Sequence, residues 1–376
     1  MRPGLPLRAP RRPESAAAMR PAALVFLLAS AFLSAAGGSE IPVVRFGAVD
    51  YVSVDDCADR LGLRQVRLAP QPSVMLKDGA RPVARLSEHS REIDLLGLRV
   101  FLGDPVVARG DTLYVSRIDF QTRILPRLRP DLCGPPPRPP HVIAIDPGHG
   151  GTDQGASNKV LGSMEKTYTL DVALRLKRLL EGAGYKVVLT RDSDFDLPKP
   201  LRSEIANRAN ADLFVSIHFN SLYPNTKTTG VEILYFPPRS QRSAESWSPG
   251  RKDDAESKDA PVNAFDEWSS VLGGFLHRRV LDALHDGDRG EKFEHLGVLR
   301  GLKCPGVLVE SAFISSDAEG AKLATQEFRE AIAGALFAGI RDYAGEIKAL
   351  LPAAIQAAAA ESGPTQHSQP TRPAGP

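Results

Sequence analysis

From Val142 to about residue 351, short apolar runs alternate with longer stretches whose apolar residues have helical spacing. Runs of about four to eight apolar residues predict buried strands, and stretches of about ten or more predict helices. The predicted strands cover residues 142–147, 185–191, 212–219, 230–236 and 306–313, and the predicted helices cover 165–184, 201–211, 265–285 and 326–347. This alternation predicts an α/β fold in which helices flank a mostly parallel central sheet.

The chain ahead of this region has a different pattern. Residues 40–130 alternate short apolar runs with Gly-Asp turns, which predicts a small β-rich domain. Residues 131–140 are rich in proline, which predicts a stiff linker. We therefore expect the β-rich domain to precede an α/β domain at 141–351.

The two ends of the chain and one internal segment lie outside this core. Residues 1–38 contain a charged start, a short apolar stretch and a small-residue end, which is typical of a secretory signal peptide. An anchor that stays uncleaved is the alternative reading. A signal peptide predicts a periplasmic or cell-envelope-associated protein. Residues 237–262 are polar and predict a mobile insertion, and residues 352–376 predict a disordered tail.

Charge and cysteine content limit the partners and the cross-links. The formal net charge of +2 is too small to indicate a nucleic-acid partner. An exported chain permits disulfides. Cys57 and Cys133 flank the β-rich domain and form the candidate pair, which leaves Cys304 unpaired.

Polar side chains follow the predicted strands where each strand ends. His149 follows the strand at 142–147, His218 ends the strand at 212–219, and Glu310 interrupts the apolar run at 306–313. In open α/β sheets the functional site lies beyond the carboxyl ends of the strands. Glu165 opens the next helix, with Ser163 as its candidate N-cap. We expect these residues to meet at one edge of the sheet.

Two imidazoles and a carboxylate are a common ligand set for catalytic zinc, which keeps one position for water. A second carboxylate can then act as general base and acid. His149, Glu165 and His218 fit the ligand set and Glu310 fits the base, although spacing alone leaves the roles of the two glutamates open. Taken singly, each residue also has a structural reading, as a turn or sheet histidine or as a favourable charge in a first helical turn.

The segments VIAIDPGHGGTDQGA, DLFVSIHFNS and GVLVESAF, in this order, resemble the zinc-dependent N-acetylmuramoyl-L-alanine amidases over about residues 141–345. The resemblance implies one zinc ion held by His149, Glu165 and His218. It also implies hydrolysis of the amide between N-acetylmuramic acid and L-alanine in peptidoglycan, with Glu310 as general base and acid. Peptidoglycan is then the expected partner, and a requirement for a protein activator stays open.

Two further readings of the chain stay open beside this one. The first is a peptidoglycan-binding protein that keeps the fold without turnover, and the second is a zinc peptidase with a related substrate. Some members of the resembled family carry a blocking glutamate after the strand at 230–236, and Glu245 and Glu256 could take that place here. The N-terminal residues 40–130 loosely resemble the N-terminal module of copper amine oxidases, which would localise the enzyme or bind wall polymer.

Overall fold

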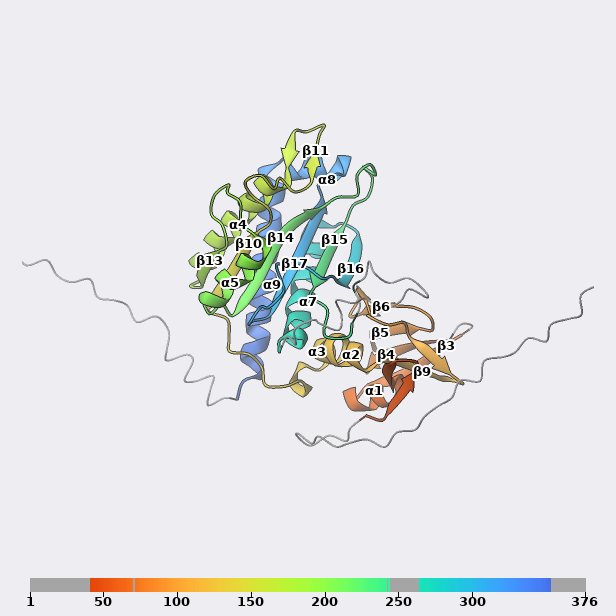
Figure 1. Cartoon of the computed structure of the whole chain (residues 1–376). Helices are drawn as coiled ribbons and strands as arrows, with labels where there is room; N and C mark the ends of the chain where they lie inside the picture. The colour runs from red at the N-terminus through yellow and green to blue at the C-terminus, as the bar shows by residue number, and fades with distance from the viewer. Residues whose placement is uncertain (1–40, 70–71, 242, 244–263, 353–376) are drawn as a thin grey trace, which may run out of the picture. The chain divides into compact units, whose positions relative to one another are not determined.

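The computed structural model describes residues 41–69, 72–241, 243 and 264–352 (Figure 1). All of them belong to one compact unit, Gly38–Pro376. The predicted signal peptide, most of the predicted insertion with Glu245 and Glu256, and nearly all of the predicted tail lie outside the described residues. Within the described ranges, no helix is both long enough and apolar enough to cross a membrane.

The largest element of the described structure is an 11-stranded sheet. Its strands follow in the order β13 (Lys186–Leu189), β10 (Val142–Pro147), β14 (Leu213–Asn220), β17 (Gly306–Phe313), β15 (Val231–Tyr235), β16 (Asp288–Phe293), β7 (Leu98–Phe101), β6 (Glu92–Leu95), β5 (Arg81–Ser87), β4 (Ser73–Asp78) and β3 (Arg64–Leu68). The strands from β13 to β17 pair in parallel, β15 pairs antiparallel with β17, and β16 is parallel to β15. The prediction of a mostly parallel central sheet is confirmed for the α/β region.

Helices cover both faces of this parallel region (Figure 1). On one face lie α4 (Glu165–Gly182), α7 (Asp266–Leu284) and α9 (Gln326–Leu350), which pack against alternate strand residues such as Ile145 and Val309. On the other face, α5 (Lys199–Arg208) and the chain near Leu299 pack against residues such as Ala144 and Leu308. Because neighbouring residues of a strand point to opposite faces, strands buried on both sides read as continuous apolar runs in the sequence.

The N-terminal part is rich in strands, as predicted, but it does not stand apart from the central sheet. Its antiparallel strands β3 to β7 join that sheet through β7 and β16, where Val100 lies opposite Glu291. A second sheet and a set of short helices complete this part: β1 (Val43–Phe46), β2 (Val49–Ser53), α1 (Val54–Leu61), β8 (Val107–Arg109), β9 (Thr112–Ser116), α2 (Arg117–Asp119), η1 (Phe120–Ile124), α3 (Leu125–Leu128) and η2 (Pro130–Leu132).

The predicted disulfide between Cys57 and Cys133 is wrong for this structure, since all three cysteines are free. Cys57 lies in α1 and is buried in the core of the N-terminal part. Cys133 packs at the edge of the same core. The two thiols act as small apolar side chains in this core rather than as a cross-link.

The sequence patterns missed strand β16, the small hairpin of β11 (Ser157–Asn158) and β12 (Ser163–Met164), and helix α8 (Asp317–Leu323). Strand β16 reads DRGEKF, which has neither the alternation nor the apolar run that predicts a strand. It nevertheless pairs with strands on both of its sides. Tertiary pairing therefore overrides local composition at this strand.

Glu291 in β16 is fully buried and is held by a cluster of charged and polar groups. Arg127 of α3 donates to both carboxylate oxygens at 2.8 and 2.9 Å, and the Tyr235 hydroxyl donates at 2.8 Å. The guanidinium of Arg123 lies 3.6 Å away, and His277 Nδ1 lies 3.3 Å away. Burial would raise the pKa of Glu291, but Arg127, His277 and Arg123 outweigh burial and hold the pKa well below its ordinary value.

We predict that Glu291→Gln lowers the free energy of unfolding by about 3–5 kcal/mol, because it leaves two buried guanidinium groups without their carboxylate. Urea unfolding measures this loss. The matched variant Glu204→Gln removes an exposed ion pair with Arg208 and is expected to cost at most about 1 kcal/mol. Equal losses in the two variants would contradict a supporting role for the buried cluster.

The lowered pKa of Glu291 also predicts that its contribution to the free energy of unfolding depends on pH. The carboxyl of Glu291 has a lower pKa in the folded chain than in the unfolded chain, so its stabilisation is present above the unfolded value of about 4.3. It is lost as the pH falls below that value. The difference in unfolding free energy between the wild type and Glu291→Gln should therefore shrink in acid, and a pH-independent difference would contradict this assignment.

Candidate functional site

The carboxyl ends of β10, β14 and β17 lie side by side at one edge of the sheet. Asp146 of β10 pairs in register with Ser216 of β14, and His218 of β14 pairs with Glu310 of β17. His149 follows the end of β10 directly. The structure thus brings the strand-end residues together, as the sequence pattern predicted.

Buried hydrogen bonds fasten the loop that follows β10. The Asp146 carboxylate accepts hydrogen bonds from Arg202 at 2.8 Å and from the Ser216 hydroxyl at 2.7 Å. Arg202 also donates to the His149 carbonyl at 2.8 Å, and Arg191 donates to the Gly148 carbonyl at 2.8 Å. Asp146, Arg191 and Arg202 therefore support the site and do not line its cavity.

Two glycines make room for the imidazole rings. A Cβ atom on Gly148 would lie 2.3 Å from the His218 ring, and a Cβ on Gly155 would lie 2.6 Å from the His149 ring. His149 itself has a φ of 63°, in the left-handed region that few non-glycine residues adopt. The conformation of the loop and its glycines thus leave the space that the His149 and His218 rings occupy.

Glu165 lies at the start of α4 and bridges the two histidines. Its Oε1 lies 2.9 Å from His218 Nδ1, and its Oε2 lies 3.1 Å from His149 Nε2. The backbone N–H groups of Phe219 and Ala156 donate to the same carboxylate at 3.0 and 2.8 Å. Burial would raise the pKa of Glu165, but the hydrogen bonds with His149 and His218 outweigh burial and hold the pKa well below its ordinary value.

The capping prediction for α4 is wrong. Met164 occupies the N-cap position, and its side chain makes no capping hydrogen bond. Ser163 lies instead in β12, where it pairs with Asn158. The tertiary contacts of Glu165, rather than a capping side chain, therefore hold the start of this helix.

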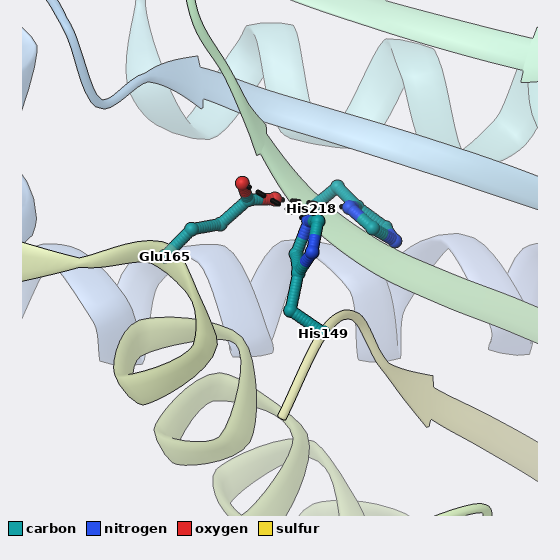
Figure 2. Close-up of side chains that lie close together, drawn as sticks. All are labelled: His149, Glu165 and His218. Carbon is teal, nitrogen blue, oxygen red and sulfur yellow. Dashed lines mark hydrogen bonds and ion pairs between the residues drawn. The ribbon is translucent and has the colours of Figure 1, made fainter. Parts of the chain in front are cut away.

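His149, Glu165 and His218 form a cluster that could hold a metal ion (Figure 2). Each offers a ligand atom, and these atoms all lie within 4.8 Å of one another. The figure shows that the three side chains come from the loop after β10, the start of α4 and strand β14, and that they point toward one another. Within the described chain, this is the group of at least three histidine, cysteine, aspartate or glutamate side chains whose donor atoms come close enough to share one metal ion.

Glu310 lies on β17 beside this cluster. It pairs in register with His218 on one side and with Glu232 of β15 on the other. Its Oε2 atom is shielded from solvent and has no hydrogen-bond partner among the described residues. Burial raises the pKa of Glu310 well above its ordinary value, and the carboxylates of Glu165 and Glu232 raise it further.

Glu232 is a charged neighbour of the site that sequence reasoning missed. It accepts hydrogen bonds from Lys292 at 2.7 Å, Arg289 at 3.1 Å and Asn220 at 2.8 Å. Asn220 thus has a structural partner in Glu232. A carboxylate within the apolar run GVEILYF was a usable signal for Glu232, since the same signal had drawn attention to Glu310.

A cavity of about 250 Å³ joins the site residues to the surface. Its lining includes His149, Glu165, His218, Glu310 and, unforeseen from the sequence, Lys199. No pattern in the sequence marks Lys199, because a single lysine at the start of a helix carries no such signal.

Cys304 and Asn207 lie away from this cavity and have structural roles. Burial raises the pKa of the Cys304 thiol to about 12, which leaves it unreactive near neutral pH. Asn207 donates to the Gly301 carbonyl and accepts from the Lys303 N–H, both at 2.9 Å. Both residues therefore serve the packing of the fold rather than the chemistry of the cavity.

The fold and the site define an α/β protein with a candidate metal centre at the carboxyl ends of its parallel strands. Residues 143–342 match the family model for N-acetylmuramoyl-L-alanine amidase, and the chain belongs to this family. The family assignment agrees with the resemblance inferred from the segments around His149, His218 and Glu310.

Curated relatives match about half of the chain. The probable N-acetylmuramoyl-L-alanine amidase AmiB of Haemophilus influenzae is 34% identical over 226 residues, which cover 54% of this chain and 51% of that protein. The N-acetylmuramoyl-L-alanine amidase AmiA of Escherichia coli is 32% identical over 220 residues, covering 54% of this chain and 75% of the relative. The chain thus spans about half the length of the Haemophilus relative.

Among solved structures, the N-acetylmuramoyl-L-alanine amidase AmiC2 of Nostoc punctiforme is 30% identical. The match covers 54% of this chain and 96% of that one, with a TM-score of 0.44. The CwlD amidase of Clostridioides difficile, solved in complex with the GerS lipoprotein, is 28% identical, covers 55% of this chain and 99% of that one, and has a TM-score of 0.44.

We predict that Gly148→Ala weakens metal binding by roughly 10- to 100-fold, the range seen when groups that orient metal ligands are lost. The added Cβ would displace the His218 ring. Metal content after dialysis against graded chelator measures the effect. Gly134→Ala is the matched control, because a Cβ there meets no atom within 4 Å. Unchanged metal retention in Gly148→Ala would contradict a ligand role for His218.

Proposed function

We propose that the protein is a zinc-dependent N-acetylmuramoyl-L-alanine amidase that hydrolyses the amide between N-acetylmuramic acid and L-alanine in peptidoglycan. The observation that carries this proposal is the cluster of His149, Glu165 and His218 with Glu310 beside it in one cavity. Membership of the amidase family supports the substrate class. Zinc, the individual site roles and the activity of this chain are all part of the proposal.

The donor set fits zinc. Two imidazoles and one carboxylate are the ligands of many catalytic zinc sites, and ligand atoms around tetrahedral zinc lie about 3.3 Å apart for bonds of about 2 Å. The donor atoms of the cluster lie within 4.8 Å of one another, so small side-chain rotations are enough to bring them to the spacing that zinc requires. His218 Nε2 is shielded from solvent and lacks a hydrogen-bond partner within the described residues, which leaves a ring nitrogen available.

Zinc in this position would supply a Lewis acid and would make water nucleophilic near neutral pH. The residues of the chain hold the ligand side chains in position. Glu165 holds the two imidazoles through its hydrogen bonds, and the loop held by Arg191 and Arg202 places His149.

Glu310 has the position and the environment of a general base and acid. Its Oε2 would accept a proton from the water that adds to the carbonyl carbon and would give the proton to the L-alanine nitrogen as the C–N bond breaks. A raised pKa brings a carboxyl closer to neutral pH, where a general base and acid is most effective. No covalent intermediate with the protein is needed, in agreement with the unreactive thiol of Cys304.

The other parts of the chain complete the proposal. Residues 1–38 would export the protein to the periplasm or the cell envelope, where peptidoglycan is accessible. Residues 40–130 would localise the enzyme or bind wall polymer, as their resemblance to the copper amine oxidase N-terminal module implies. A protein activator and self-inhibition by Glu245 or Glu256 stay predictions, since the latter residues lie outside the described chain.

We predict that Glu310→Gln lowers kcat for peptide release from purified peptidoglycan by about 10²- to 10⁴-fold, the usual range for loss of general acid–base catalysis. Zinc content should stay at one ion per chain, because Glu310 is not in the ligand cluster. Chromatography of released stem peptides measures turnover, and elemental analysis measures zinc. Wild-type turnover in this variant would overturn the mechanism.

The same assay separates the alternatives. A wild-type protein that binds peptidoglycan but releases no peptide, with zinc bound, would support a binding protein. Cleavage within the stem peptide instead of at the muramoyl amide would support a peptidase. Loss of release on chelation and its recovery with zinc are expected for the proposed amidase.

A further inference from the structure

Lys199 is a cation on the wall of the proposed catalytic cavity that the mechanism above does not use. It is the first residue of α5, is exposed to solvent, and lines the same cavity as His149, His218 and Glu310. Its ammonium group makes no hydrogen bond or ion pair with any residue that the structure describes. A cation that faces a substrate cavity without a protein partner is available to a ligand.

The other lysine and arginine side chains around the site are already held. Lys166 donates to the Gly151 carbonyl at 2.8 Å and to Asp194 at 2.7 Å. Arg289 and Lys292 both donate to Glu232. Arg191 and Arg202, as described above, hold carbonyl oxygens of the loop that carries His149. Lys199 therefore differs from these cations in its lack of a partner within the described structure.

One acid that could compete for Lys199 is Asp153, whose carboxylate Lys199 influences electrostatically. That carboxylate lies 3.0 Å from His149 Nδ1 and forms its ion pair there. Asp153 is thus occupied, and the ammonium of Lys199 remains available.

The stem of Lys199 packs against Gly297, which also lines the cavity. A Cβ atom on Gly297 would lie 3.5 Å from Lys199 Cβ and 3.8 Å from its Cδ, which is ordinary contact distance. Gly297, Leu296 and Val298 line the same cavity. The lysine side chain therefore lies along the part of the cavity wall that Gly297 forms.

We propose that Lys199 binds a carboxylate of the stem peptide, on the leaving-group side of the scissile amide, and so determines which way the substrate lies in the cavity. This inference rests on the proposed function. The muramic acid carboxyl is consumed in the scissile amide, so the sugar side of the bond offers no free carboxylate. The peptide side does, because its second residue is a glutamate linked through the side chain, whose α-carboxyl is free or amidated.

The dimensions agree with this assignment. Successive residues of an extended chain are about 3.3–3.6 Å long, so the α-carboxyl of the second residue lies about 7 Å from the scissile nitrogen. The long, flexible lysine side chain and the cavity of about 250 Å³ can accommodate that separation. An ammonium–carboxylate hydrogen bond would be formed equally in the bound substrate and the transition state, so its loss should appear mainly in KM.

The test uses two soluble muramoyl peptides that differ only in the second residue, with a free α-carboxyl in one and a carboxamide in the other. For the full-length zinc-loaded protein, kcat/KM should be roughly 5- to 30-fold higher for the free acid. Lys199→Ala should abolish this preference by lowering kcat/KM for the acid alone. Lys199→Arg should keep much of the preference, since it restores the cation.

Lys186→Ala is the matched control, because Lys186 is exposed at the first residue of β13, at the far end of the parallel strands from the site. It removes the same charge and should leave the preference unchanged. The inference is overturned if wild-type protein shows no preference for the acid, if Lys199→Ala retains the preference, or if it slows both substrates equally.

A binding experiment separates this inference from the proposed function. The Glu310→Gln variant, alone and combined with Lys199→Ala, is titrated with both peptides by calorimetry, which needs no turnover. If the wild type hydrolyses neither peptide, the proposed function fails. The ratio of the two dissociation constants then still decides whether Lys199 recognises the carboxylate, and circular dichroism verifies that each variant is folded.

Discussion

The parallel pairing of β10, β14 and β17 is the constraint on which the site depends. Parallel strands in register place their carboxyl ends at one edge, so that His149, His218 and Glu310 meet although they are far apart in sequence. Glu165 then joins them from the first turn of α4, and its buried carboxylate bridges the two imidazoles. A change of register in β14 by one residue would turn His218 to the opposite face of the sheet and separate it from His149 and Glu165.

A second, unexpected constraint lies in β16, where a buried carboxylate replaces the apolar side chain that a sheet interior normally holds. Glu291 is tolerated there because Arg127 and Tyr235 satisfy its oxygens. Since Arg127 comes from α3 of the N-terminal part, the α/β region and the N-terminal part share this cluster as well as the pairing of β7 with β16. The segment that follows β16 contributes Leu296 to Val298, which line the cavity. The contacts that hold β16 in place therefore also help to position this part of the cavity wall.

Much of the fold was predictable from apolar periodicity. Strands β10 and β17 and helices α7 and α9 lie where the pattern placed them, within a few residues at their ends. Periodicity failed where charge dominates, as in β16, and where elements are only two residues long, as in β11 and β12. It also failed for the Cys57–Cys133 pair and for the cap at Ser163, because spacing alone does not say which way a side chain points.

For the site, the sequence by itself determined which residue types stand at the strand ends, because a histidine or a glutamate within an apolar run needs a partner or a ligand. It thereby singled out His149, Glu165, His218 and Glu310. Only the tertiary structure decided how they are arranged, with Glu165 between the histidines and Glu310 between His218 and Glu232. The same holds for Lys199. Its ammonium has no hydrogen-bond or ion-pair partner within the described residues, whereas the neighbouring cations do, and this difference follows from contacts between distant segments rather than from any local pattern.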